Sequence, residues 1–79
     1  MKTITVYAAQ IQGYHYLGIS ADKTEAIKKI IAQVYPLCEF LNAEQLRVDS
    51  CVYNVRVKGT HLTYVVPVFL TNHEVSFDE

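Results

Sequence analysis

Apolar and polar residues alternate along the N-terminal part of the chain, which is the pattern of β-strands that have one apolar face. Residues 3–11 form one alternating run, and residues 14–19 form a second. Gly13 separates them, and a glycine between two alternating runs is typical of a β-hairpin turn. We therefore expect a hairpin around Gly13, with Tyr14 and Tyr16 on one face of its second strand.

The clearest pattern comes next, where apolar residues recur at steps of three and four. The residues of this stripe are Ile27, Ile30, Ile31, Val34, Tyr35 and Cys38. Such spacing places them on one side of an amphipathic helix, with lysines on the other side. Asp22 can cap the first turn with its carboxylate, and Glu25 stands at the spacing of a capping box. Pro36 disfavours helical geometry at the residue before it, so we expect the helix to end near Tyr35.

The C-terminal half predicts two more strands. Residues 46–57 alternate, with a change of apolar phase at Asp49-Ser50 that a β-bulge would accommodate. Lys58-Gly59 supplies a turn, and residues 61–70 then alternate again. Pro67 has no N–H to donate, so we expect this last strand to lie at an edge of the sheet or to contain a bulge.

Together these elements predict an α+β fold of order β-β-α-β-β, in which one helix packs on one face of a four-stranded antiparallel sheet. We expect a single domain over residues 1–71. Residues 37–45 show no clear pattern beyond one short extra turn, and residues 72–79 form a polar, acidic segment that we expect to be frayed. One face of such a sheet stays uncovered by the helix.

Composition narrows the possible functions. The chain has 79 residues, of which 51% are hydrophobic, and at this size a single core is only just adequate. Seven basic and eight acidic residues give a net charge of −1, so no overall field would draw the chain to nucleic acid or to anionic lipid. No apolar run is long enough for a signal peptide or a membrane-spanning helix, and we expect a cytoplasmic protein.

Six tyrosines in so short a chain indicate a contact surface. Because most of them fall on predicted strands, the uncovered sheet face is where we expect a partner to bind. Tyrosine contributes a large contact area and has few rotamers to order. The candidate partner-binding residues are Tyr7, Tyr14, Tyr16, Val65 and Phe69. Alternatively, these side chains pack against one another or beneath residues 37–45.

Nucleic acid is the alternative partner, because aromatic rings on a sheet can stack on bases. The basic residues that would support such binding are Lys28, Lys29, Arg56 and Lys58. Lysines on the outer side of a helix are usually a solvated surface, and no basic-aromatic strand motif of the RNA-binding sheets is present. We therefore expect a protein partner before a nucleic acid.

Motifs for catalysis and metal binding are not apparent in the sequence. His15, His61 and His73 lie on three different segments, and no spacing such as H-E-x-x-H predicts a metal site. Cys38 and Cys51 predict two buried reduced thiols, with a disulfide between them as the alternative. We expect no cofactor and no enzymatic activity. A cleft that held Cys51 within hydrogen-bond reach of a histidine would indicate an enzyme instead.

These observations predict a small non-enzymatic protein-binding module. A second copy is the first candidate partner, because an edge strand with an apolar face invites pairing about a two-fold axis, and we expect a homodimer. The short chain without catalytic motifs would suit an accessory protein of a phage or other mobile element that inhibits a host complex. A charge near zero makes a poor DNA mimic, so steric blocking similar to that by anti-CRISPR proteins is the expected mechanism.

Overall fold

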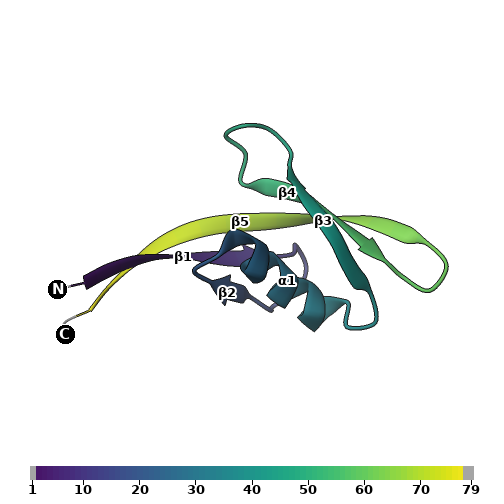
Figure 1. The fold of residues 1–79 in the computed structure, drawn as a ribbon, viewed down its shortest axis with the longest axis horizontal. Coiled ribbons are helices and arrows are strands. Elements are labelled where there is room, and N and C mark those ends of the chain that lie inside the picture. The colour runs from purple at the N-terminus through teal and green to yellow at the C-terminus, as the bar shows by residue number, and fades with distance from the viewer. Residues whose placement is uncertain (1, 78–79) are drawn as a thin grey trace.

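The computed structural model describes residues 2–77, which form one helix and a single antiparallel sheet of five strands. The elements in chain order are β1 (Lys2–Gln10), β2 (Gly18–Ser20), α1 (Lys23–Val34), β3 (Glu39–Gln45), β4 (Val52–Lys58) and β5 (Thr63–Phe77). The strands lie in the order β2-β1-β5-β4-β3, and α1 crosses one face of the sheet (Figure 1). The α+β class and the single helix on an antiparallel sheet are confirmed, whereas the prediction of four strands is wrong.

Strand β3 is the element that the sequence pattern did not predict. It pairs antiparallel with β4, and its register shifts between Phe40 and Asn42. Phe40 and Ala43 both pack against the core, although they are three positions apart. This bulge removes the period of two on which strand prediction depends, so residues 39–45 indicated only a short turn.

The first hairpin forms around Gly13 as predicted, but its second strand is much shorter than expected. Gly13 has a φ of 90°, a conformation that glycine adopts without strain, and Tyr14 N donates to Ile11 O at 3.1 Å. Residues 14–17 are a loop, and only Gly18–Ser20 pair with β1. The alternation of residues 14–19 therefore belongs mostly to a loop.

A loop over residues 46–51 connects β3 to β4 where we expected the beginning of a long strand. Leu46 N donates to Val52 O at 3.0 Å, and Val52 N donates to the Ser50 hydroxyl at 3.0 Å. The bulge predicted at Asp49-Ser50 is wrong, because the apolar phase changes there as the chain turns between two strands.

Strand β5 is the longest in the sheet and lies at its centre, between β1 and β4. Pro67 is tolerated there because β1 ends with Gln10 opposite Phe69, so no residue of β1 lies opposite the proline. On its other side Pro67 pairs with Asn54 of β4. The strand is thus locally an edge at the proline, although it is not an edge strand of the sheet. Residues 72–77, which we expected in a frayed tail, continue β5 and pair with β1; residues 78–79 lie outside the described part.

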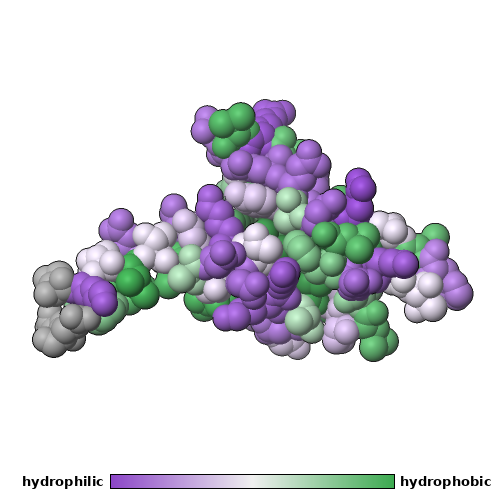
Figure 2. Space-filling view, in the orientation of Figure 1, coloured by the Kyte–Doolittle hydropathy of each residue, from purple (hydrophilic) through white to green (hydrophobic). Residues whose placement is uncertain are grey.

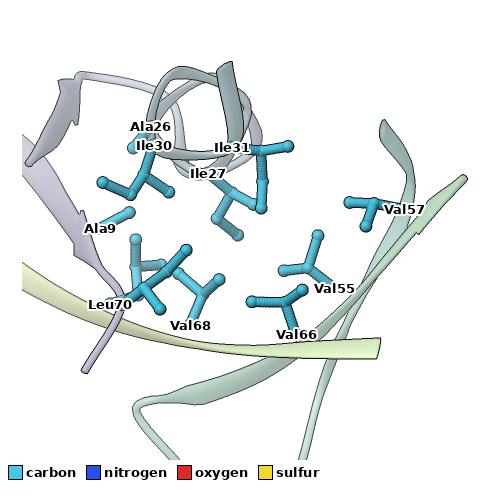
Figure 3. Close-up of a cluster of buried hydrophobic side chains, with 11 residues drawn as sticks. Ala9, Ala26, Ile27, Ile30, Ile31, Val55, Val57, Val66, Val68 and Leu70 are labelled. Carbon is cyan, nitrogen blue, oxygen red and sulfur yellow. The ribbon is translucent and has the colours of Figure 1, made fainter. Parts of the chain in front are cut away.

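The hydrophobic core lies between α1 and the middle of the sheet. Ala26, Ile27, Ile30 and Ile31 point down from the helix onto side chains of β1, β4 and β5 (Figure 3). The sheet residues that meet them are Ala9, Val55, Val57, Val66, Val68 and Leu70. All of these side chains are at least nine-tenths buried, so the strong helical stripe of the sequence does form the core.

Helix α1 begins and ends as the sequence predicts. The Asp22 carboxylate accepts a hydrogen bond from Glu25 N at 3.1 Å, and the last helical residue, Val34, precedes Tyr35 and Pro36. Two polar side chains of the helix also hold the segment that precedes it: Lys29 Nζ donates to Ile19 O and Gln33 Nε2 donates to Leu17 O, each at 2.8 Å. These contacts attach β2 and its loop to the helix.

One end of the sheet extends well beyond the helix. Residues 2–6 of β1 pair with residues 73–77 of β5, and we call this two-stranded ribbon the β-arm. Figure 1 shows the β-arm projecting clear of α1, with both chain ends at its tip. The molecule accordingly measures 49 × 26 × 21 Å. Across residues 2–77, no helix combines the length and the apolar content that crossing a membrane requires.

Candidate functional site

The sheet face opposite α1, here called the open face, carries a row of apolar side chains that Thr71 and His73 interrupt on β5. Val66, Val68 and Leu70 of β5 are buried beneath the helix, so the alternating residues between and beyond them point the other way. The strand register places residues of β1, β2 and β4 beside them. The apolar residues of the open face are Ile4, Val6, Ala8, Ile19, Val52, Val65, Pro67, Phe69, Val75 and Phe77.

Large side chains of the open face are accessible to solvent. Val65 is 58% exposed and Ile19 is 50% exposed, and in the β-arm Val75 is 43% exposed. Val6 and Phe69 are half-buried by their neighbours. Figure 2 views the molecule from the opposite side, where mostly hydrophilic residues cover α1. Exposed apolar rows of this length are uncommon on a small protein and usually mark a binding surface.

Of the predicted partner-binding residues, Val65 and Phe69 lie on the open face. Tyr7 lies on the other face, where it packs against the core, and Lys23 Nζ stands 5.4 Å from the centre of its ring. The reason is the phase of β1, whose buried residue is Ala9, so that Tyr7 shares the helix side with it. The prediction that Tyr7 lies on the uncovered face is therefore wrong.

Tyr14 and Tyr16 are on the loop that precedes β2, not on the sheet, and each is about half exposed. The Tyr14 ring packs beside Tyr35, with ring centroids 6.4 Å apart and planes tilted by 57°. Burial raises the pKa of Tyr35, and a side-chain hydrogen bond with Tyr14 raises that pKa further. Tyr14 thus packs against an aromatic side chain outside the predicted set, and the predicted tyrosine face does not exist.

The apolar residues of the β-arm were missed by the sequence prediction. Ile4 belongs to the first predicted strand but not to the predicted binding residues. Val75 and Phe77 belong to the segment that we expected to be frayed. A signal was present, because the alternation along β5 continues past Leu70 to Phe77. Thr71 and His73 interrupt its apolar character, so the pattern predicted that the strand ends at residue 70.

The four candidate basic residues do not form one patch. Lys28 pairs with Glu25 at 3.7 Å and lies 5.6 Å from the ring centre of Phe40. Lys29 is bonded to the backbone of β2, as described above. Arg56 and Lys58 instead lie on the open face, because Val55 and Val57, which alternate with them along β4, point to the core.

A pocket of about 470 Å³ lies on the helix side of the sheet, beside the beginning of α1. Its lining residues are Tyr7, Lys23, Gln45, Asp49, Ser50, Cys51, Tyr53, Leu70, Thr71 and Asn72. No histidine is among these described residues, so the cysteine-histidine cleft that would indicate an enzyme is not formed here. Cys38 and Cys51 are both free thiols, but Cys51 is exposed rather than buried.

Metal-binding side chains are scattered over the structure. Among residues 2–77, histidine, cysteine and carboxylate side chains do not gather in groups of three or more that could hold a metal ion. No model of a known protein family matches the chain, and searches of curated proteins and of solved structures find no match. The assignment of a function therefore depends on the surface of the molecule itself.

Proposed function

We propose that the chain is a small non-enzymatic protein-binding module, and that the open face with its β-arm is the binding surface. The observation that supports this proposal is the solvent-accessible surface of the chain, which is larger than that of a compact monomer of the same mass. The chain exposes 5725 Å², whereas a compact monomer of its mass of 9.0 kDa exposes about 4,850 Å². The excess is roughly 900 Å², which is close to the ~800 Å² that each partner contributes to a standard protein interface.

The overall dimensions of the chain agree with this excess. Its radius of gyration is 13.6 Å, and a compact domain of the same length has about 11.6 Å. The β-arm accounts for the extension, and a ribbon of two strands is only marginally stable without something packed on it. Valine, isoleucine, proline and phenylalanine on the open face offer contact area to a partner instead of groups that react with a substrate.

Substitutions on either side of the same strand test the proposal. Val75→Lys places a charge on the open face of the β-arm, and Ser76→Lys places the same charge on its other face. Val65→Lys and Tyr64→Lys form a second such pair on the wider part of β5. All four side chains are exposed to solvent, so the variants should fold.

Each protein is purified by its tag from nuclease-treated bacterial lysate that also contains a differently tagged copy of the chain. We expect one protein, either a host protein or the second copy, to co-purify with the wild type and with the Ser76 and Tyr64 variants. The Val75 and Val65 variants should lose it. Equal retention by all four variants, or recovery of nucleic acid without any protein, would contradict the proposal.

Nucleic-acid binding is the second candidate, and the position of Arg56 and Lys58 on the open face favours it. Arg56 lies beside Val65 and Lys58 beside Thr63, so both would stand near the phosphates of a strand that continues from a base stacked on Phe69. Reversing Arg56 and Lys58 to glutamate should then abolish binding to mixed oligonucleotides at low salt, where phosphate contacts are strongest. Reversing Lys28 and Lys29 should not. A cytoplasmic location and a role as a steric inhibitor of a host complex stay predictions from the sequence.

A further inference from the structure

We infer that the partner on the open face is a second copy of the chain, placed antiparallel, with the two-fold axis of the dimer passing close to Thr71. This inference rests on the proposed function, because it names the occupant of the same surface. Three observations carry it: the order of side chains along β5, the hydrogen bonding at the middle of the row, and the length of the row.

The side chains of β5 on the open face read almost the same from both ends. In order they are Val65, Pro67, Phe69, Thr71, His73, Val75 and Phe77. Both ends are apolar and the middle is polar. A rotation of 180° about Thr71 lays Phe77 of one copy on Val65 of the other, and Val75 on Pro67. A two-fold interface uses the same patch on both subunits, so it requires a patch that complements itself in this way.

Neighbouring strands widen the row along its middle part. Ile4 of β1 lies beside Val75, and Val52 of β4 lies beside Phe69. At the middle, Ala8 of β1 lies beside Thr71, and its small side chain allows a second sheet to approach. The apolar surface thus extends over a neighbouring strand between Phe69 and Val75, whereas polar residues of β4 lie beside Pro67 and Val65.

The polar residues at the middle are already bonded within one copy. Thr71 Oγ1 lies 3.0 Å from His73 Nε2, and it also donates to Ala8 O at 3.4 Å. Covering them therefore does not leave a hydroxyl without a hydrogen bond, which would cost about 1–3 kcal/mol. About this axis Thr71 of one copy meets Thr71 of the other, so the two hydroxyls lie within reach of each other, while His73 lies over Phe69.

The length of the row fits a stable dimer. Residues 65–77 span roughly 40 Å at about 3.3 Å per residue; the face is three strands, or roughly 14 Å, wide over the first half of this length and two strands, or roughly 10 Å, wide in the β-arm. The face then covers about 480 Å² on each copy, or about 960 Å² for the two. That area is close to the ~1,000 Å² expected of a specific interface and stays within the excess surface of the chain.

The first test is the oligomeric state in sedimentation velocity at micromolar concentration. We expect a dimer for the wild type and for Ser76→Lys, and a monomer for Val75→Lys. A monomeric wild type, or a Val75→Lys protein that still dimerises, would overturn the inference. If the wild type is monomeric but Val75→Lys loses a different co-purified protein, only the second-copy inference fails. If no partner protein of any kind is found, the proposed function fails with it.

Cross-linking then tests the antiparallel arrangement. In a chain that has Cys38→Ala and Cys51→Ser, single cysteines are introduced on the open face and treated with a short bis-maleimide. Thr71→Cys should cross-link to its own mate at the axis, whereas Val75→Cys alone should not, because its mate lies roughly 26 Å away along the strand. A mixture of Pro67→Cys and Val75→Cys proteins should cross-link. Self-cross-linking of Val75→Cys as efficient as that of Thr71→Cys would indicate parallel strands and overturn the inferred arrangement.

Discussion

Gly18 is the residue at which β2 comes closest to helix α1. A Cβ atom at this position would collide with the carbonyl oxygen of Ala26 and would lie 2.6 Å from the backbone nitrogen of Ile30. These are backbone atoms of a helix, so they cannot turn away as the end of a side chain can. The absence of a Cβ is therefore what lets β2 pack beneath the helix.

We predict that Gly18→Ala lowers the free energy of unfolding by about 1–3 kcal/mol, because β2 must move away from α1 to relieve the overlap. Urea denaturation followed by circular dichroism measures this change. Gly59→Ala is the matched control, since its Cβ would meet the movable ring of Tyr64 at 3.0 Å. The explanation is wrong if both substitutions reduce stability equally.

Tyr35 makes the stability of the protein depend on pH in the alkaline range. Its pKa is raised mainly by burial, and the unfolded chain releases the same proton near pH 10. The protonated phenol therefore favours the folded state below about pH 10, and this contribution is lost as the pH rises through the raised pKa. We predict that Tyr35→Phe makes the loss of stability between about pH 9 and pH 11 less steep.

Urea denaturation at a series of pH values checks the role of Tyr35. Tyr16→Phe serves as the control, because it removes the same hydroxyl group from a tyrosine that is exposed on a loop. A slope that stays the same in Tyr35→Phe, or that changes equally in both variants, would show that the alkaline transition comes from other groups.

At the scale of elements, the helix was the most predictable part of the chain. Its stripe, its cap and its terminating proline all act within a few residues, so they can be recognised from local sequence. Strand β3 could not be recognised, because a bulge breaks its alternation. The length of β5 was also missed, because residues 72–77 become a strand only by pairing with β1, a long way off in the sequence.

The β-arm is the element whose stability depends most on what covers it. Its two strands pair only with each other, and no helix lies over them. We predict that the backbone amides of residues 2–6 and 73–77 exchange with solvent much faster in Val75→Lys than in the wild type, because the charge prevents a partner from covering the ribbon.

Hydrogen exchange measured by NMR tests this behaviour of the β-arm. Amides of α1 report on global opening and should exchange alike in both proteins. Ser76→Lys, on the opposite face of the ribbon, should keep the protection of the wild type. Equal exchange rates in the β-arm of all three proteins would mean that the ribbon is stable without any cover.

For the whole molecule, the balance between core and surface is the main feature. One helix of twelve residues cannot cover a sheet of five strands in a molecule that is 49 Å long. The helix buries the middle of one face, and the second face is left to solvent or to a partner. A chain of this size gains little from a larger core of its own, and association is a common way to complete it.

The sequence by itself determined the class of the fold, the helix with both its ends, and the Gly13 turn. These features depend on periodicity and on the conformational preferences of single residues, which act over short distances. Only the tertiary structure decided the strand order, the length of β5 and the side of the sheet on which Tyr7 lies. Strand pairing joins residues far apart in the chain, and a register shift of one residue exchanges the two faces of a strand, so no local pattern determines them.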